Sequence, residues 1–252
     1  MLELKNVSFN VDQEGLDKEI IRNVSLTLPD GRLTVITGPN GGGKSTLARL
    51  IAGIERPASG QILWNGQDIT GWTVTERARA GIAFAFQQPV RFKGIQVFDL
   101  IRLAAGKPLN VAEACKYLSR VGLCARDYID REVNASLSGG ELKRIEIATV
   151  LARSAALTIF DEPEAGIDLW SFQNLIEVFE AMRADIAGSS ILIISHQERI
   201  LNIADEVVVL KEGQVAEQGD KEDILPGLIG TSSAIPECRV GEDIGGNSHG
   251  EA

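Results

Sequence analysis

No apolar run in the sequence approaches the length of roughly 20 residues that is needed to cross a bilayer. The longest compact runs are short segments such as Ile191 to Ile194 and Val207 to Leu210. The first residues show neither the basic region nor the apolar core of a secretory signal, so we expect a cytoplasmic protein. Cysteine is scarce, and Cys115, Cys124 and Cys238 form no CxxC pair, which suits a reducing compartment.

Positive charge is also in short supply. The chain has 25 Lys plus Arg against 35 Asp plus Glu, a formal net charge of -10, which argues against a nucleic-acid partner. Residues of the apolar set make up 44% and charged residues 24% of the 252 residues, close to the globular average. This length and composition predict one large α/β domain or two unequal lobes, with a core that needs no disulfides.

Compact apolar runs alternate with helical patterns, and this alternation predicts a mostly parallel sheet. Between residues 86 and 136 two helical patterns occur without a convincing strand, so we expect a helical insertion there. The last dozen residues are rich in glycine and are expected to be mobile. The expected strands cover 2–11, 20–28, 33–37, 82–86, 157–160, 191–194 and 207–210, and the expected helices cover 45–54, 97–105 and 111–121.

A glycine-rich loop joins the expected strand at 33–37 to the helix at 45–54. It reads GPNGGGKS and satisfies the phosphate-loop pattern G-x-x-x-x-G-K-[ST]. Inward-facing N–H groups and the start of a helix together attract a triphosphate. Lys44 is placed to contact the β and γ phosphates, and Ser45 to contact Mg²⁺. The predicted ATP-binding residues of this loop are Gly38, Pro39, Asn40, Gly41, Gly42, Gly43, Lys44, Ser45 and Thr46.

Two carboxylates follow the apolar run at 157–160, at the end of a predicted buried strand where ligands bind in parallel sheets. Asp161 is suited to hold Mg²⁺, and Glu162 to polarise the water that attacks the γ-phosphate. Acids after a strand also serve as helix caps, but a phosphate loop upstream favours catalysis. The pair therefore predicts an ATPase.

A third motif, LSGGE, opens a helix 21 positions before Asp161. A phosphate-loop protein with this segment resembles an ABC-type ATPase, whose signature is usually LSGGQ. The resemblance covers about residues 1–220 and implies a P-loop α/β fold with a mixed sheet core, an antiparallel β subdomain and a helical subdomain. We expect a single domain over 1–230, a helical part over about 88–150, and a C-terminal tail over 231–252. The signature residues are Leu137, Ser138, Gly139, Gly140 and Glu141.

The family resemblance implies a dimer in which each ATP lies between the loop of one subunit and the signature of a second. Gln87 looks like the Q-loop residue that contacts the metal or the attacking water, with Gln88 as a weaker alternative. Asp168 resembles the D-loop aspartate that contacts the partner subunit. His196 looks like the switch histidine that contacts the γ-phosphate. Mg²⁺ would then be held by Ser45, Gln87 and Asp161, and catalysis would depend on Lys44, Glu162 and His196.

The aromatic residue that often stacks on adenine in this family is missing. Val11 occupies the corresponding position, and Phe9, which lies on the same face of the strand, is a substitute. We therefore expect ATP as the nucleotide, with weak discrimination against other purine triphosphates.

Several segments resemble the SufC-type ATPases of iron–sulfur cluster assembly. These are FQQPV at 86–90 with Gly94, DREVN at 130–134 and SGGELKR at 138–144. The resemblance implies soluble scaffold partners related to SufB and SufD. The alternative is the ATP-binding subunit of a membrane ABC transporter, docked on a permease. Lys143 and Arg144 either contact a partner or are solvated, and solvation is the favoured interpretation.

Overall fold

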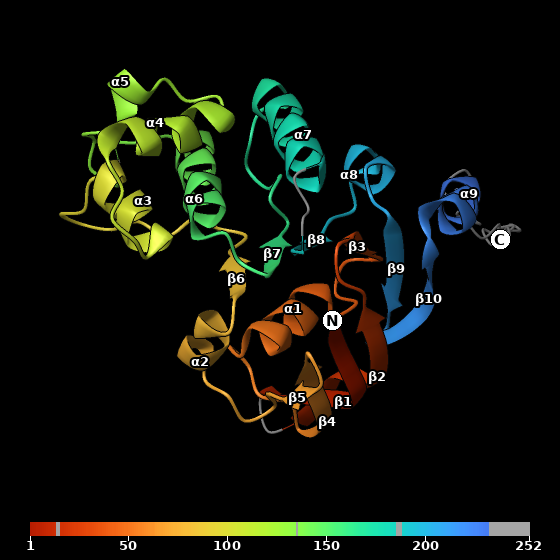
Figure 1. Cartoon of the computed structure of the whole chain (residues 1–252). Helices are drawn as coiled ribbons and strands as arrows, with labels where there is room; N and C mark the ends of the chain where they lie inside the picture. Colours follow the sequence, from red (N-terminus) through yellow and green to blue (C-terminus); the bar gives the residue numbers. More distant parts are fainter. Residues whose placement is uncertain (14–15, 135, 185–187, 232–252) are drawn as a thin grey trace, which may run out of the picture.

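The strands form two sheets in the computed structural model, which describes residues 1–13, 16–134, 136–184 and 188–231 (Figure 1). An antiparallel sheet has the order β2-β1-β4-β5, and a larger mixed sheet has the order β10-β9-β3-β8-β7-β6. The strands are β1 (Leu2–Gln13), β2 (Leu16–Leu28), β3 (Leu33–Thr37), β4 (Ser59–Trp64), β5 (Gln67–Asp68), β6 (Ile82–Ala85), β7 (Leu157–Asp161), β8 (Ser190–Ile194), β9 (Glu206–Lys211) and β10 (Gln214–Asp220).

The larger sheet confirms the predicted parallel core. Strands β9, β3, β8, β7 and β6 run parallel, and only β10 pairs antiparallel, with β9. Every strand expected from the sequence is present, whereas β4, β5 and β10 were missing from the prediction. β4 and β10 are half-exposed strands in which polar residues break up the apolar run, so neither resembles a buried strand.

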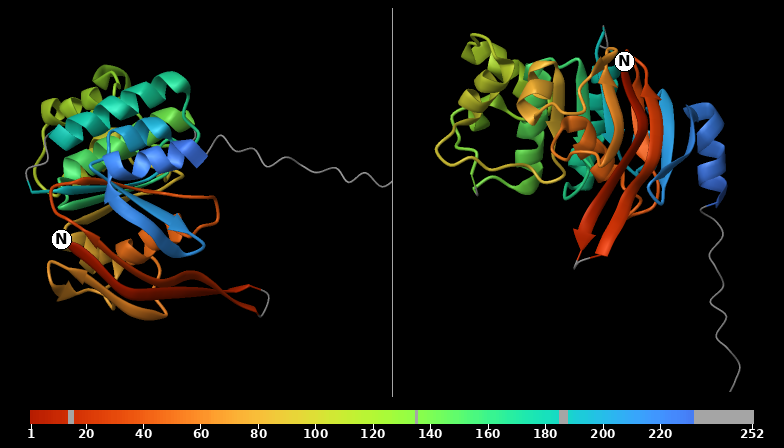
Figure 2. Two further views of the ribbon diagram at one scale, coloured as in Figure 1. Left: turned by 90° about the vertical axis from the view of Figure 1, so that its right-hand side faces the viewer. Right: turned by 90° about the horizontal axis from the view of Figure 1, so that it is seen from below.

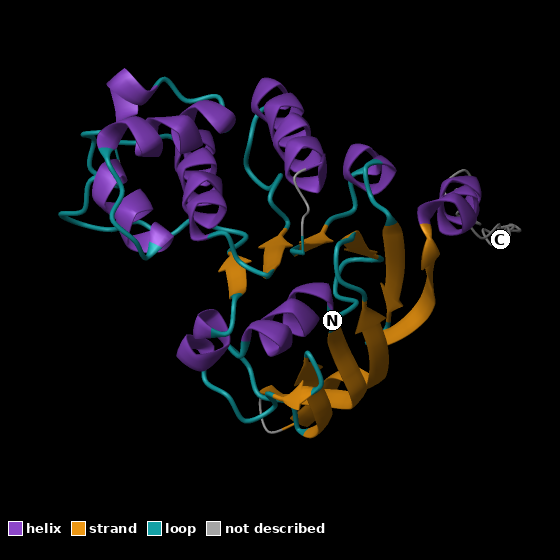
Figure 3. Ribbon diagram, in the orientation of Figure 1, coloured by secondary structure: helices purple, strands orange, loops and turns teal. Residues whose placement is uncertain are grey.

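Helix α1 (Lys44–Ala52) lies between the two sheets (Figures 1 and 3). Its buried residues Leu47, Leu50 and Ile51 belong to a core that also contains side chains of both sheets. Neighbouring residues of β3 face opposite sides of the larger sheet, so that Ile36 enters this core and Val35 enters the core on the other face. Both faces of the parallel sheet are therefore covered.

The second face of the larger sheet carries most of the remaining helices (Figure 2). The helical patterns expected at 97–105 and 111–121 form α3 and α4, which pack with α6 beyond the edge strand β6 (Figure 1). Within the described ranges, no helix combines the length and apolar character needed to cross a bilayer. The helices are α2 (Val74–Arg79), α3 (Val97–Ala105), α4 (Val111–Arg120), α5 (Ala125–Tyr128), α6 (Gly139–Arg153), α7 (Leu169–Ala184), α8 (Glu198–Asn202) and α9 (Lys221–Thr231).

The fold confirms the expected class, an α/β cassette with an antiparallel sheet subdomain and a helical subdomain. The expected limits of the domain (1–230) and of its helical part (88–150) stay predictions. Residues 232–252 of the expected tail lie outside the described residues.

The predicted site residues follow strands that end at one edge of the larger sheet. In the parallel register Ile36 of β3 pairs with Ile194 of β8, Asp161 of β7 also pairs with Ile194, and Ala85 of β6 pairs with Phe160. The segments that follow these strands must therefore meet at one side of the molecule.

Candidate nucleotide-binding site

The glycine-rich loop turns between β3 and α1 in a conformation that only glycine can adopt at its first position. Gly38 has φ of 135°, and a Cβ there would lie 2.0 Å from the carbonyl oxygen of Leu210 on β9. The loop is held by hydrogen bonds from the Gly42 N–H to the Pro39 carbonyl (3.1 Å) and from the Gly213 N–H to the Gly42 carbonyl (3.1 Å). Its shape is therefore fixed before any ligand arrives.

Lys44 is buried and folds back over this loop. Its Nζ donates to the carbonyl oxygens of Gly38 (2.8 Å) and Pro39 (3.0 Å), which holds the ammonium group inside the curve of the loop. A buried cation beside the first N–H groups of a helix forms a binding place for an anion such as a phosphate.

Ser45 and Asp161, predicted as metal ligands, are in direct contact. The Ser45 hydroxyl donates to Oδ1 of Asp161 at 2.7 Å, which joins the loop to the end of β7. Burial raises the pKa of Asp161, and the Ser45 hydroxyl acts in the opposite direction. A hydroxyl beside a carboxylate at the mouth of a phosphate loop is a donor set suited to Mg²⁺, which prefers oxygen ligands.

Gln87 and Glu162 are also brought together. Nε2 of Gln87 donates to Oε2 of Glu162 at 2.6 Å. The amide oxygen is the atom of the Gln87 side chain that could bind a metal ion. Glu162 has φ of 44°, and its N–H donates to the carbonyl of Ile194 at 3.0 Å, which fixes the turn after β7 against β8. A strained, well-held carboxylate is typical of a functional position.

An open cavity of about 510 Å³ lies between the loop and this pair. Such a volume is in the range of small-molecule sites. Two lining residues, Lys18 and Ile20 of β2, were not predicted from the sequence. The cavity is lined by Lys18, Ile20, Asn40, Gly41, Gly43, Lys44, Ser45, Thr46, Gln87 and Glu162.

His196, Asp168 and the signature residues are not part of this lining among the described residues. His196 follows β8 with an exposed ring, and its Nε2 lies 3.4 Å from Nε2 of Gln197. Asp168 caps α7: it accepts the Ser171 N–H (3.0 Å) and the Ser171 hydroxyl (2.7 Å). A Cβ on Gly140 would lie 3.9 Å from Oδ2 of Asp168, so the predicted D-loop and signature lie side by side.

The signature segment begins helix α6 with a capping box. Ser138 accepts the Glu141 N–H (3.2 Å), and Glu141 accepts the Ser138 N–H (2.6 Å). The Tyr128 hydroxyl also donates to Glu141, and this bond, followed by the Ser138 N–H, lowers the pKa of Glu141. Glu at position 141, where the family usually has Gln, therefore preserves the cap. It also adds a negative charge that accepts a hydrogen bond from Tyr128 of α5.

The structure places Phe9 and Val11 differently relative to the cavity. Phe9 is partly buried, packs against the core around α1 and does not line the cavity. Val11 pairs across the β-hairpin with Lys18, which lines the cavity. Phe9 as a substitute for the stacking residue stays a prediction, and β2 supplies Lys18 and Ile20 to the side of the cavity next to Val11.

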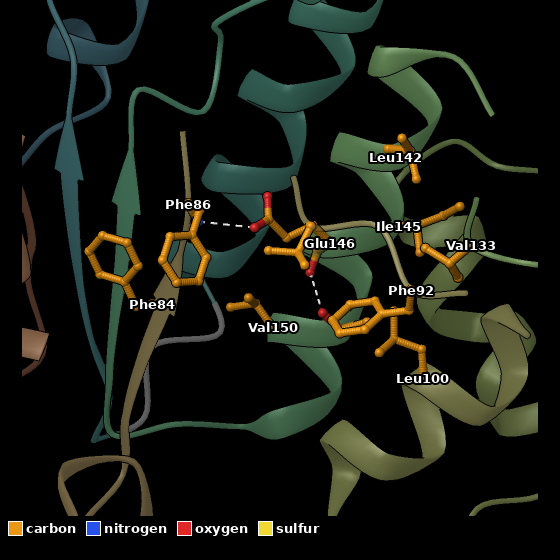
Figure 4. Close-up of a pocket in the computed structure, with 11 residues that line it drawn as sticks. Phe84, Phe86, Phe92, Leu100, Val133, Leu142, Ile145, Glu146 and Val150 are labelled. Carbon is orange, nitrogen blue, oxygen red and sulfur yellow. Dashed lines mark hydrogen bonds between the residues drawn. The ribbon is translucent and has the colours of Figure 1, made fainter. Parts of the chain in front are cut away.

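A second, smaller cavity of about 170 Å³ lies between β6 and the helical subdomain (Figure 4). Phe86 and Val90, on either side of Gln87 in the sequence, are among its lining residues. Its walls are mostly apolar, and the rings of Phe84 and Phe86 meet edge to face at 5.0 Å. Glu146 lies in this wall and accepts the Phe86 N–H at 3.0 Å (Figure 4). Two exposed apolar side chains, Phe86 and Val90, border the cavity.

A family model described as ABC transporter matches residues 21–165. The uncharacterized ABC transporter ATP-binding protein MJ0035 of Methanocaldococcus jannaschii is 39% identical over 216 residues, 82% of this chain and 86% of that protein. The spermidine/putrescine import ATP-binding protein PotA of Mesoplasma florum is 34% identical over 251 residues, 96% of this chain and 69% of that protein. The chain therefore belongs to the ABC transporter ATP-binding family.

A solved structure shares the fold. The dimeric post-hydrolysis structure of the ATP-binding cassette MJ0796, bound to ADP and Pi, matches with a TM-score of 0.78, 22% identity, 88% of this chain and 99% of that chain.

Proposed function

We propose that this chain is an ATP-hydrolysing ABC subunit that pairs with a second copy around ATP and drives a conformational change in a partner. One observation carries the proposal: Ser45, Gln87 and Glu162 line one cavity with the phosphate loop, where Gln87 contacts Glu162 (2.6 Å) and Ser45 contacts the buried Asp161 (2.7 Å). A binding loop, a metal donor set and a carboxylate base are the parts that phosphoryl transfer to water requires.

Each residue has a separate task in this mechanism. The loop N–H groups and Lys44 bind the phosphates, and Glu162 accepts the proton of the attacking water. Ser45, Asp161 and the amide oxygen of Gln87 would hold Mg²⁺, which supplies charge neutralisation on the phosphates when bound. His196 contacts the γ-phosphate and maintains the geometry of attack. The Glu162 N–H donates to the carbonyl of Ile194 at the end of β8, so the turn that carries the base is joined to the strand that leads to His196.

The proposed dimer explains the position of the signature. Residues Leu137 to Glu141 begin α6, whose N-terminal N–H groups can bind an anion, yet they do not line the cavity of their own chain. In an antiparallel pair the signature of each chain faces the cavity of the other. Asp168, beside Gly140, then lies at the same interface.

The names of the curated relatives favour a membrane permease as the partner. PotA is an import ATP-binding protein, as are relatives named for sulfate/thiosulfate import, and these names support a subunit peripheral to the membrane. The apolar cavity beside the Q-loop, with exposed Phe86 and Val90 at its border, is a suitable place for a partner helix (Figure 4).

A soluble scaffold related to SufB and SufD is the second candidate partner. It is favoured by the sequence segments FQQPV, DREVN and SGGELKR, which resemble SufC-type ATPases. All three segments supply residues to the same cavity: Phe86 and Val90, Val133, and Leu142. The ATPase chemistry is identical for both partners.

The test uses the full chain with Lys44→Ala and Glu162→Gln. Lys44→Ala should weaken Mg-ATP binding, whereas Glu162→Gln should keep binding, lower kcat roughly 100-fold or more and accumulate as an ATP-bound dimer in analytical ultracentrifugation. Normal turnover by Glu162→Gln would overturn the mechanism. Capture of partners by that variant, with Mg-ATP, separates the candidates: a multi-helix permease in the detergent extract or scaffold subunits in the aqueous fraction.

A further inference from the structure

Glu164 is a buried acid next to the proposed site that the mechanism above leaves unused. It follows Pro163 in the turn after β7, between the base Glu162 and the D-loop. Its Oε1 accepts the hydroxyl of Ser195 at 2.5 Å, and Ser195 is the residue immediately before His196. One carboxylate therefore links the turn that carries the base to the turn that carries the histidine.

Ser195, which is fully buried, makes several of the contacts that hold the turn around His196. The Ser195 N–H donates to the carbonyl of Ile36 (3.2 Å), and the Ser195 hydroxyl accepts the N–H of Gln197 (3.0 Å). Because it also donates a hydrogen bond to Glu164, the Ser195 hydroxyl is both a donor and an acceptor. The backbone on both sides of His196 is thus fixed, while the ring itself is exposed.

The second oxygen of Glu164, Oε2, is buried, and no hydrogen-bond donor within the described part of the chain reaches it. Burial raises the pKa of Glu164, and the Ser195 hydroxyl and the backbone N–H of Glu164 oppose this. Among the charged groups, His196 lowers the pKa of Glu164 and Glu162 raises it. A buried carboxylate oxygen without a donor is costly, so its persistence points to a donor that arrives with the ligand.

We propose that Glu164 is a positioning residue for His196. Oε1 holds the histidine-bearing turn through Ser195. When nucleotide is bound, Oε2 accepts one ring N–H of His196, and the second ring N–H of the protonated imidazole donates to the γ-phosphate. A carboxylate that accepts one imidazole N–H fixes the orientation of the ring. This inference rests on the proposed function, because it needs a γ-phosphate for His196 to contact.

The ring of His196 can be observed directly by NMR, because the chain has few histidines. The chain has 2 histidines, His196 and His249, so a full chain labelled with ¹⁵N-histidine gives two sets of ring signals, and His249→Gln assigns them. With Mg²⁺ and the non-hydrolysable analogue AMP-PNP, the wild type should show one fixed ring environment for His196, with a proton on both ring nitrogens. Glu164→Gln, which keeps the size of the side chain, should shift these signals and leave those of His249 unchanged.

Kinetics separates positioning from a general structural defect. Glu164→Gln should lower kcat about 10-fold to 100-fold, the range for residues that orient a functional histidine, and leave KM within about twofold. In the His196→Ala background the same change should have no further effect. Glu198→Gln, an exposed acid close to His196 in α8, is the matched control and should behave as wild type in both experiments.

Three results would overturn the inference: unchanged His196 signals in Glu164→Gln with nucleotide bound, an equal loss of kcat with and without His196, or the same loss in Glu198→Gln. A wild-type chain that binds no Mg-ATP would overturn the proposed function as well. Nucleotide binding by the wild type therefore tells which of the two proposals has failed.

Discussion

The ammonium group of the buried Lys143 lies 3.0 Å from Oε2 of the largely buried Glu146, one turn further along α6, and this pair holds the peptide unit that begins the Q-loop. Glu146 accepts the Phe86 N–H (3.0 Å), and Lys143 donates to the carbonyl of Phe86 and, at 3.4 Å, to that of Gln87. The helix that begins with the signature is thereby joined to the segment that carries Gln87. A shift of one would be transmitted to the other.

Lys143→Met should lower the free energy of unfolding by about 3–5 kcal/mol, because it leaves the Glu146 carboxylate buried without its counter-charge. Glu146→Leu in the same chain should recover part of this loss, because an apolar pair needs no counter-charge. The measurement is urea unfolding, with Lys116→Met on the exposed face of α4 as the control. A loss below about 1 kcal/mol for Lys143→Met, typical of exposed pairs, would contradict this assignment.

Much of the nucleotide site could be predicted from the sequence, because parallel strands deliver their following residues to one edge. Ser45 and Asp161 are 116 positions apart, yet each follows a strand of the same parallel sheet. The phosphate loop, the two acids and the Q-loop residue were predicted to lie together only because each follows a strand and the strands were predicted to be parallel. The trans role of Leu137 to Glu141 stays a prediction, since it concerns a second chain.

Lys143 shows what the sequence could not reveal. A lysine next to Arg144 on a helix resembles a solvated face, and the expectation of solvation was wrong for Lys143, which is 1% exposed. Its burial depends on backbone carbonyls 57 and 56 positions earlier in the chain. Such a backbone acceptor leaves no trace in composition or periodicity. Lys18 was missed for a similar reason, because the path of the β1–β2 hairpin decides whether it borders the cavity.

Arg77 should be a major contributor to stability. It is buried and donates to the last carbonyls of α1, Leu50 (2.6 Å) and Ile51 (2.8 Å), and to Thr70 (3.0 Å). Burial lowers its pKa to about 10, so the guanidinium remains charged at neutral pH. Arg77→Ala should cost about 3 kcal/mol, because buried carbonyls lose their donors. Thermal or urea unfolding measures this, and the exposed Arg79→Ala should change stability by under about 0.5 kcal/mol.

The Arg77→Ala and Arg79→Ala variants can also be compared by their affinity for Mg-ATP. Since Arg77 supports the end of α1 opposite to Lys44, it should act on stability and leave Mg-ATP binding intact in the folded fraction. A loss of binding without a loss of stability would show that Arg77 acts through the phosphate loop.

Glu141 should make stability depend on pH. Its pKa in the folded chain is lowered, first by the Tyr128 hydroxyl, so folding favours its ionised form. The stabilisation is therefore present above the ordinary pKa of a glutamate and is lost as the pH falls through the lower, folded value. Glu141→Gln keeps the capping pattern, so its deficit in free energy of unfolding should be constant near neutrality and shrink in acid.

Tyr128→Phe is the companion variant, because it removes the largest cause of the shift. In the Tyr128→Phe background, Glu141→Gln should cause a smaller loss of stability at neutral pH than it does in the wild type. The measurement is urea unfolding at several pH values from about 3 to 7, where carboxylates titrate. A deficit for Glu141→Gln that grows in acid would have the wrong sign and refute the assignment.

The base side of the cavity should discriminate weakly between purine nucleotides. Val11 offers no ring to stack on, and Lys18 offers only donors. N7 accepts from an ammonium group in both purines, whereas O6 accepts in guanine and the 6-amino group of adenine does not. ATP and GTP should therefore bind within about tenfold of each other, a difference of about 1.4 kcal/mol. Competition binding with Mg²⁺ measures the ratio.

Substitutions at Val11 and Lys18 separate the contribution of base stacking from that of the contacts made by the Lys18 ammonium group. Val11→Tyr should tighten both nucleotides about tenfold, since a base on an aromatic ring gains about 1–3 kcal/mol, whereas Val11→Ile, which adds bulk without a ring, should not. Lys18→Ala should weaken GTP more than ATP, because guanine loses contacts at two acceptors and adenine at one. If Lys18→Ala instead weakened ATP alone, the ammonium group would not face the purine edge, and the base would have to lie elsewhere along β2.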